Sequence, residues 1–134
     1  MGQPAAKQGD QIVATDTHIV MVPAPPAPNP VPTPLPHPFA GIIGGGLSSD
    51  VKIMGLPAAT VDSTADNMPP HIPTPPGTSF QKGPSNKATI KVGSPTVKIN
   101  GKMAARNGDM AETCNDPADL PAGTVIAVGT VFIG

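Results

Sequence analysis

The chain has 134 residues, of which 20 are proline and 15 glycine, and it carries 8 basic and 9 acidic side chains. This near-neutral charge, without a basic stripe or stacking aromatic residues, excludes nucleic-acid binding. Dense proline excludes long helices, because proline inside a helix costs about 3 kcal/mol. With three Phe and no Trp or Tyr, only a small core is expected, and a chain of this kind needs a further stabilising link. The single Cys excludes an internal disulfide, so a metal or oligomerisation has to supply that link.

The chain starts with a turn-like segment, GQPAAKQGD at residues 2–10, which returns twice. The second copy is GLPAATVD at residues 55–62 and the third is GKMAARNGD at residues 101–109. We call these copies the Ala-Ala motifs. Their defining residues are Pro4, Ala5, Ala6, Pro57, Ala58, Ala59, Ala104, Ala105 and Arg106. An acidic residue recurs as Asp10, Asp62 and Asp109, which indicates turn formation or hydrogen bonds to histidine.

A proline-rich segment, PAPPAPNPVPTPLPHP, occupies residues 23–38. It predicts the longest irregular loop of the chain. One interpretation is a disordered or polyproline II segment, and another is a stiff, ordered surface loop. We favour order at its C-terminal end because His37 lies there.

Three β-hairpins are predicted along the rest of the chain. Residues 39–54 read FAGII-GGGLSS-DVKIM, residues 88–100 read ATIKV-GSP-TVKIN, and residues 124–133 read TVIAV-GT-VFI. Each has β-branched segments on both sides of a glycine-containing turn, which is a typical hairpin signal.

The order of motifs and hairpins describes a closed cycle of three units. The first two hairpins run directly into an Ala-Ala motif, whereas the third ends the chain and its motif stands at the N-terminus. We therefore expect the two termini to lie close together and the fold to have approximate threefold symmetry. The prediction is one all-β domain over residues 1–134, with units at about 2–54, 55–100 and 101–134 and no effector extension.

Three histidines and the cysteine occupy related places in the units. His18 lies 16 residues after Gly2, and His71 lies 16 residues after Gly55. Cys114 follows Gly101 in the corresponding loop, and His37 ends the proline-rich segment. Threefold symmetry would bring these side chains together. The alternative is that the histidines are scattered loop residues and the cysteine is a small buried apolar side chain.

A set of three imidazoles and one thiolate is suited to zinc, which prefers four tetrahedral nitrogen and sulfur ligands. The sequence predicts His18, His37, His71 and Cys114 as ligands of one structural Zn²⁺ per chain. Four protein ligands close the coordination shell, whereas a catalytic zinc keeps one position open. Zinc fits one thiolate better than iron(II) or another divalent ion does.

The motif GQPAAKQGD, its two further copies and the His/His/His/Cys set resemble PAAR-repeat proteins over essentially the whole chain. That family is named for a Pro-Ala-Ala-Arg motif. The first copy departs from it at Lys7, the second at Thr60 and the third at Met103. The resemblance implies a small cone of short β-hairpins with a zinc ion near its point, held by three His and one Cys.

The resemblance also implies a function. PAAR-repeat proteins cap and sharpen the trimeric VgrG-type spike of contractile injection machines, one tip to each trimer, and help it to pierce the target membrane. Such machines include type VI secretion systems and phage-tail-like extracellular particles, and their tips sometimes carry effector cargo. No catalysis is expected in this role.

Two other functions are left open by the sequence. One is a proline-rich, metal-binding adaptor that recruits cargo to the spike through PxxP-like segments, and the other is a zinc-dependent hydrolase. The N-terminus lacks the charged and apolar regions of a secretory signal, and no apolar run is long enough to span a bilayer. We therefore expect synthesis in the cytoplasm without a signal peptide, and display at the tip of an apparatus outside the producing cell.

Overall fold

The computed structural model describes residues 2–26 and 29–134, and this part of the chain contains strands and turns but no helix. The strands are β1 (Gln3–Pro4), β2 (Gln11–Val22), β3 (Val31–Gly45), β4 (Lys52–Ile53), β5 (Leu56–Pro57), β6 (Thr64–Asn67), β7 (Ser79–Phe80), β8 (Lys87–Ile90), β9 (Lys98–Ile99), β10 (Lys102–Met103), β11 (Met110–Thr113), β12 (Leu120–Ile126) and β13 (Phe132–Ile133). The predicted all-β class is confirmed. Over the same residues, no helix is long and apolar enough to cross a membrane.

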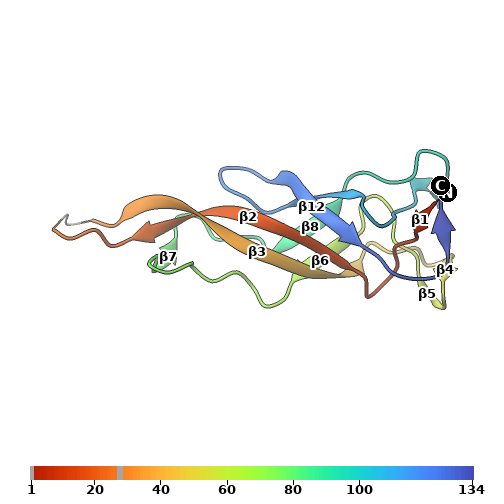
Figure 1. Ribbon diagram of the computed structural model, residues 1–134, viewed down its shortest axis with the longest axis horizontal. Coiled ribbons are helices and arrows are strands. Elements are labelled where there is room, and N and C mark those ends of the chain that lie inside the picture. Colours follow the sequence, from red (N-terminus) through yellow and green to blue (C-terminus); the bar gives the residue numbers. More distant parts are fainter. Residues whose placement is uncertain (1, 27–28) are drawn as a thin grey trace.

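The central part of the molecule is a closed, barrel-like sheet. Its strand order is β12-β11-β8-β6-β3-β2, and β2 pairs with β12 to close the ring. Figure 1 shows an elongated molecule, with this body in the middle, a broad end that carries β1, β4 and β5, and a narrow end formed by β2 and β3. Closure leaves the central strands without free edges.

At the broad end the three Ala-Ala motifs surround an approximate threefold axis. The amide of Ala6 donates to the carbonyl of Ala105, Ala105 donates to Ala59, and Ala59 donates to Ala6, at 2.9 to 3.0 Å. The same cyclic relation holds for the bridges Ala5↔Arg106, Lys7↔Ala58 and Thr60↔Ala104. The central alanines are fully buried. A larger side chain at these positions would overpack the axis, which explains why Ala-Ala is kept in all three motifs.

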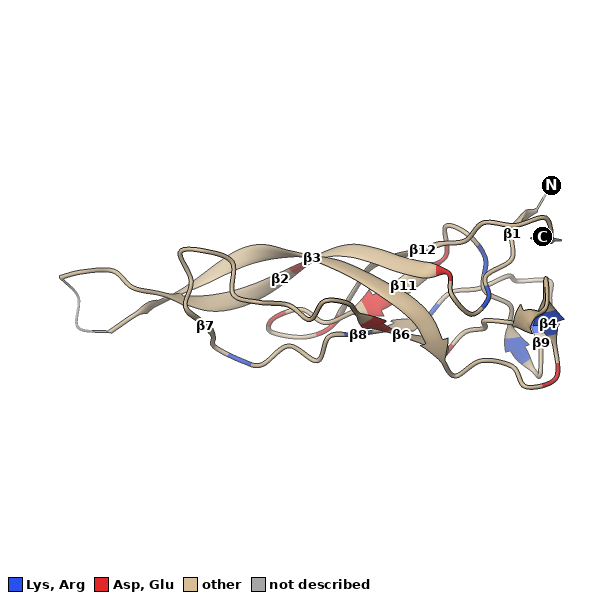
Figure 2. Cartoon of the chain, turned by 90° about the horizontal axis from the view of Figure 1, so that it is seen from below, with Lys and Arg blue, Asp and Glu red and all other residues tan. Residues whose placement is uncertain are grey.

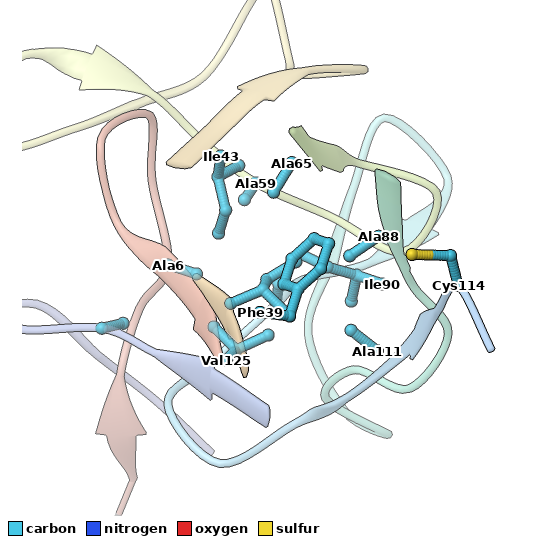
Figure 3. Close-up of a cluster of buried hydrophobic side chains, with 13 residues drawn as sticks. Ala6, Phe39, Ile43, Ala59, Ala65, Ala88, Ile90, Ala111, Cys114 and Val125 are labelled. Carbon is cyan, nitrogen blue, oxygen red and sulfur yellow. The ribbon is translucent and has the colours of Figure 1, made fainter. Parts of the chain in front are cut away.

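Each Ala-Ala pair faces two different apolar clusters. The second alanine belongs to the main core, whose largest member, Phe39, lies among the smaller side chains of the barrel in Figure 3. The first alanine belongs to a smaller cluster at the broad end. That cluster contains Ala5, Ile53, Ala58, Ile99, Ala104 and Ile133, two residues from each motif or the strand before it. The thin core expected from the composition is therefore divided between two layers.

The two termini lie side by side, as predicted. Gln3 of β1 pairs with Ile133 of β13, and both chain ends lie at the broad end in Figure 1. This contact completes the third unit across the break in the chain. It occupies the place that β4–β5 and β9–β10 occupy in the other two units.

The predicted partners of the three hairpins were wrong. β8 pairs with β6 and β11 rather than with β9, β12 pairs with β11 and β2 rather than with β13, and β3 pairs with β2 and β6 rather than with β4. The short hairpins instead join each strand to the following motif, through tight turns at Met54-Gly55 and Asn100-Gly101. All four turn residues have φ between 53° and 83°, as a two-residue turn between twisted strands requires.

The prediction of an irregular loop over residues 23–38 was wrong for its second half, which is the start of β3. Residues 31–42 pair with β2 without interruption, from Val22↔Val31 to Gln11↔Ile42. Prolines stand at every second position of this segment, and their side chains are exposed, whereas His37 and Phe39 are buried. Ala27 and Pro28, within the predicted loop, lie outside the described residues.

Two of the three recurring acidic residues form turns, and the second motif differs from the predicted alignment by one position. Asp10 accepts the backbone amide of Lys7 at 3.0 Å, and Asp109 accepts that of Arg106 at 2.7 Å. In the second motif Ser63, not Asp62, takes this place and accepts the amide of Thr60 at 2.9 Å. The prediction of turn formation is confirmed for Asp10 and Asp109. Asp62 is instead exposed, and its carboxylate forms an ion pair with Lys102 at 3.5 Å.

Candidate metal centre

The four predicted metal ligands come from four separate segments of the narrow half. His18 lies in β2 and His37 in β3, and the pairs Asp16↔His37 and His18↔Leu35 place them two residues apart in register. His71 belongs to the loop after β6, and Cys114 follows β11 directly. Alternation along β2 and β3 turns both histidines inward, so each is at most 2 % exposed.

The structure brings these side chains together. The ring centres of His18, His37 and His71 are 5.0 to 5.5 Å apart. One donor atom from each of Asp16, His18, His71 and Cys114 lies within 4.8 Å of the other three. Three predicted ligands belong to this set, and the fourth member, Asp16, was missed.

His18 has the clearest signature of an absent binding partner. Its side chain is about 1 % exposed, and neither ring nitrogen makes a hydrogen bond. The nearest carboxylate oxygen, on Asp116, is 3.6 Å from Nδ1 and accepts the amide of Ile19 at 2.9 Å. A buried ring nitrogen without a partner is unfavourable, and a metal ion would satisfy one of these nitrogens.

Asp16 is the buried charge at the centre of the cluster. Its side chain is fully buried, and Oδ1 accepts the hydroxyl of Thr113 at 2.5 Å. Oδ2 accepts Nε2–H of His71 at 2.9 Å and is 3.5 Å from Sγ of Cys114. The sequence signal was present, because Asp16 is the single charged residue between Asp10 and Asp50 and shares the inward face of β2 with His18.

His71 is held in one orientation by its two ring nitrogens. The side-chain oxygen Oδ1 of Asn67 accepts a hydrogen bond from the backbone amide of Ala40 at 2.9 Å. The side-chain nitrogen Nδ2 of Asn67 therefore faces Nδ1 of His71, at 3.2 Å. Burial disfavours the charged ring, but hydrogen bonds with Asp16 and Cys114 outweigh burial and raise the pKa of His71 to about 9. A second proton, on Nδ1, would point at the hydrogens of the Asn67 side-chain amide. This contact opposes the rise in the pKa of His71.

His37 lies against the cluster but has other partners. Its Nδ1 is 2.9 Å from the carbonyl of Leu35, and Nε2 accepts the amide of Thr74 at 3.2 Å. Burial lowers the pKa of both His37 and His18 below the usual value. Two neutral imidazoles are therefore favoured near neutral pH, the form in which imidazole binds metals.

The donor set fits a divalent metal ion. Imidazole and thiolate are preferred zinc ligands, and a thiolate at Cys114 with the carboxylate of Asp16 would balance the two charges of the ion. Without the ion, the structure leaves unpaired nitrogens on His18 and a buried carboxylate beside a thiol. Cys114 is free and buried, so its sulfur is not in a disulfide.

A comparison with known families identifies the chain. A sequence profile of the PAAR motif matches residues 34–115, and a search of curated proteins gives no match. The matched region covers more than half of the chain and contains two of the three Ala-Ala motifs that form the threefold ring. It also contains His37, His71 and Cys114. The chain therefore belongs to the PAAR motif family.

Proposed function

We propose that this protein caps the trimeric VgrG-type spike of a contractile injection machine, as a structural tip that leads the spike through the target membrane. The family is structural rather than enzymatic, so no catalytic step is assigned. The observation that carries the proposal is the ring of hydrogen bonds among Ala6, Ala59 and Ala105. A monomer with internal threefold symmetry presents a similar surface to each subunit of a trimer.

The broad end has the surface that such a contact requires. Its exposed apolar side chains include Met54, Phe132 and Val128, which are 52 %, 60 % and 71 % exposed. Lys52 and Lys98 occupy the positions equivalent to Phe132 in the other two units, and Figure 2 shows basic residues on β4 and β9 at this end. An apolar and basic face of this kind favours a protein partner with acidic rim residues.

Co-expression with a trimeric spike protein tests the proposal. We expect a complex of one chain with three spike chains, measured by native mass spectrometry. Phe132→Glu places a charge in the proposed contact and should abolish the complex, whereas Ile72→Glu, 75 % exposed in the loop that carries His71, should leave it intact. Failure of the unmodified chain to co-purify, or loss of the complex in both variants, would reject the proposal.

We further propose that one zinc ion per chain is bound by His18, His37, His71 and Cys114. Because Nδ1 of His71 faces the Asn67 side-chain amide, His71 would bind through Nε2 and give up its proton and its hydrogen bond to Asp16. Asp16 then contributes a negative charge next to the ion and keeps the hydrogen bond from Thr113. To bind the ion, Nε2 of His37 would lose only the 3.2 Å hydrogen bond that it accepts from the backbone amide of Thr74. The competing assignment puts Asp16 in the fourth position, as the distances among donor atoms favour.

Metal content of two variants decides between these assignments. His37→Ala should lose stoichiometric zinc, whereas Asp16→Asn should keep it with affinity lowered by about 10- to 100-fold, the usual effect of altering a residue that supports the ligands. Elemental analysis after dialysis measures both. The reverse result would assign Asp16 as the fourth ligand, and absence of metal from the unmodified chain would reject the zinc site.

Finally, we propose that the protein is made in the cytoplasm and displayed at the tip of a type VI secretion apparatus or of a phage-tail-like particle. Effector cargo would be a further partner of the tip. Sheath, tube and spike genes beside the gene for this chain would support the assignment to a machine.

A further inference from the structure

The narrow end of the molecule is an uncharged β-hairpin. We call residues 19–26 and 29–34, the part of β2 and β3 beyond the imidazoles with its described connection, the arm. It is the outermost element in Figure 1. Residues 17–49 contain no Lys, Arg, Asp or Glu, and Figure 2 shows the arm without charged residues. Charges lie at its root, where Asp116 accepts the amide of Ile19 and Gln81, which precedes Lys82, donates to the carbonyl of Ile19.

The outer edge of β3 has no hydrogen-bond donors along the prolines. Residues at even positions of β3 direct their backbone groups away from β2, as shown by Ala40, which donates to Asn67 and accepts from Met68. Positions 32, 34, 36 and 38 are all proline. The N–H groups that would point outward are therefore missing, whereas the odd positions keep the N–H groups that face β2.

The outer edge of β2 is closed in another way, by hydrogen bonds to other segments. The amide of Thr17 donates to Asn115 at 2.6 Å, and the amide of Ile19 donates to Asp116 at 2.9 Å. Farther along, Val20 and Met21 pair with β7. Both edges of this hairpin thus lack free donors over most of its length.

Hydroxyl groups near the arm satisfy some of its carbonyl oxygens. Within the arm, Thr33 donates to the carbonyl of Val31 at 3.2 Å and Thr78 donates to that of Met21 at 3.3 Å, and just below the arm Thr74 donates to that of Pro36 at 3.0 Å. Each contact pairs a polar side chain with a backbone acceptor. The remaining exposed side chains of the arm are proline rings, Val31, which is 46 % exposed, and one uncharged polar group, the amide of Asn29.

We propose that the arm enters the hydrocarbon region of a lipid bilayer. This inference rests on the proposed spike-tip function and names the segment and the chemistry of its contact. In hydrocarbon each unpaired backbone donor costs several kcal/mol, and the arm has removed or paired its outward donors and carries no charge. A protein partner that added a strand would need open edges, and these edges are closed.

The arm is long enough for one leaflet. From His18 to the connection it covers about 15 Å at about 3.3 Å per residue, roughly half of a hydrocarbon core about 30 Å thick. Insertion to this depth would leave Lys82 and Asp116 near the lipid headgroups.

Tryptophan fluorescence tests this inference directly, because the chain contains no Trp or Tyr. Val31→Trp places the reporter on the arm, and Val128→Trp places it at the broad end on a residue that is 71 % exposed. With phosphatidylcholine vesicles, emission from Val31→Trp should shift to the blue and be quenched by brominated acyl chains, whereas Val128→Trp should not respond. An unchanged Val31→Trp spectrum, or equal quenching of both reporters, would overturn the inference.

Proline replacement separates edge closure from simple hydrophobicity. In the Val31→Trp background, Pro32→Thr, Pro34→Thr and Pro36→Thr together restore three outward donors and should weaken partition into vesicles by about tenfold or more. The matched control replaces Pro23, Pro26 and Pro30 by Thr, outside the paired segment, and should weaken it less. Equal partition of the two triple variants would overturn the role of the prolines. Because vesicle binding is measured without the spike, its failure is distinct from failure of the spike complex.

Discussion

The two halves of the molecule differ in symmetry and in the polarity of their interiors. The broad end repeats one small unit three times around buried alanines, with backbone hydrogen bonds in a closed ring. The narrow half departs from threefold symmetry, because β2 and β3 are far longer than the equivalent strands of the other units. Its interior is polar where the broad end is apolar, and it contains Asp16, His18 and His37 at 0 to 2 % exposure.

This difference indicates how each half is stabilised. Alanine and isoleucine at the broad end bury apolar area, which is favourable without any ligand. The buried imidazoles and carboxylate of the narrow half lose hydration and recover little from one another. The broad end should therefore be stable by itself, whereas the narrow half should depend on a metal ion.

Loss of the metal is expected to have the largest effect and to act on one half. Cys114→Ser or His71→Ala should release the zinc ion and lower the free energy of unfolding by several kcal/mol. Hydrogen exchange should then accelerate at residues 16–22 of β2 and at residues 31–37 of β3, which pair with them. The amides of Ala6, Ala59 and Ala105 should stay protected.

Lys52→Ala, on the exposed face of β4, serves as the control and should retain both metal and protection. If exchange accelerated equally at the alanine ring, the two halves would unfold as one unit and the comparison would fail. Unchanged melting of Cys114→Ser would show that the thiol is not a ligand.

The sequence was informative for the broad end and less so for the narrow half. The three motifs and the adjacent termini could be predicted because repetition at a fixed spacing forces equivalent contacts. The hairpin partners could not, because the ring of alanines separates strands that are neighbours in the sequence. The Asn100-Gly101 pair was a usable signal for the observed turn.

The narrow half shows why composition can mislead. Dense proline predicts an irregular loop, yet its alternation with Val31, Thr33, Leu35 and His37 has the period of a strand. The prolines are tolerated because only one edge of β3 needs donors. Asp16 was missed because a single buried acid has no recognisable spacing, although its place among inward-facing residues of β2 indicates burial.

A smaller effect is expected at the broad end, where the motifs contain their own control. Lys7 is paired with Asp10 at 3.1 Å, with side chains 10 % and 7 % exposed, while the second motif has the neutral pair Thr60 and Ser63 in the same place. Asp10→Ala leaves a buried ammonium without its partner and should destabilise the fold by about 3 kcal/mol.

The double replacement Lys7→Thr with Asp10→Ser copies the neutral pair and should recover most of that loss, as measured by urea denaturation. Metal content should be unchanged in both variants. If the double variant were as unstable as Asp10→Ala, the charge pair would be needed at this position and the three motifs would not be interchangeable.

The smallest expected effect concerns pH and returns to the narrow half. Burial lowers the pKa of His18 and His37, so in the folded, metal-free protein they bind protons less readily than in the unfolded chain. The contribution of these two imidazoles is therefore present above the unfolded value of about 6.5 and is lost as the pH drops below it. His71 acts in the opposite direction: its pKa is raised to about 9, so its contribution is fully present below about pH 6.5 and is lost as the pH rises toward 9. Melting curves with a chelator at pH 7 and pH 5 measure the effect, which His37→Gln should reduce. If the unmodified chain and His37→Gln lost the same stability between pH 7 and pH 5, His37 would be less buried in solution, and the narrow half would not be the polar, metal-dependent region that distinguishes it from the broad end.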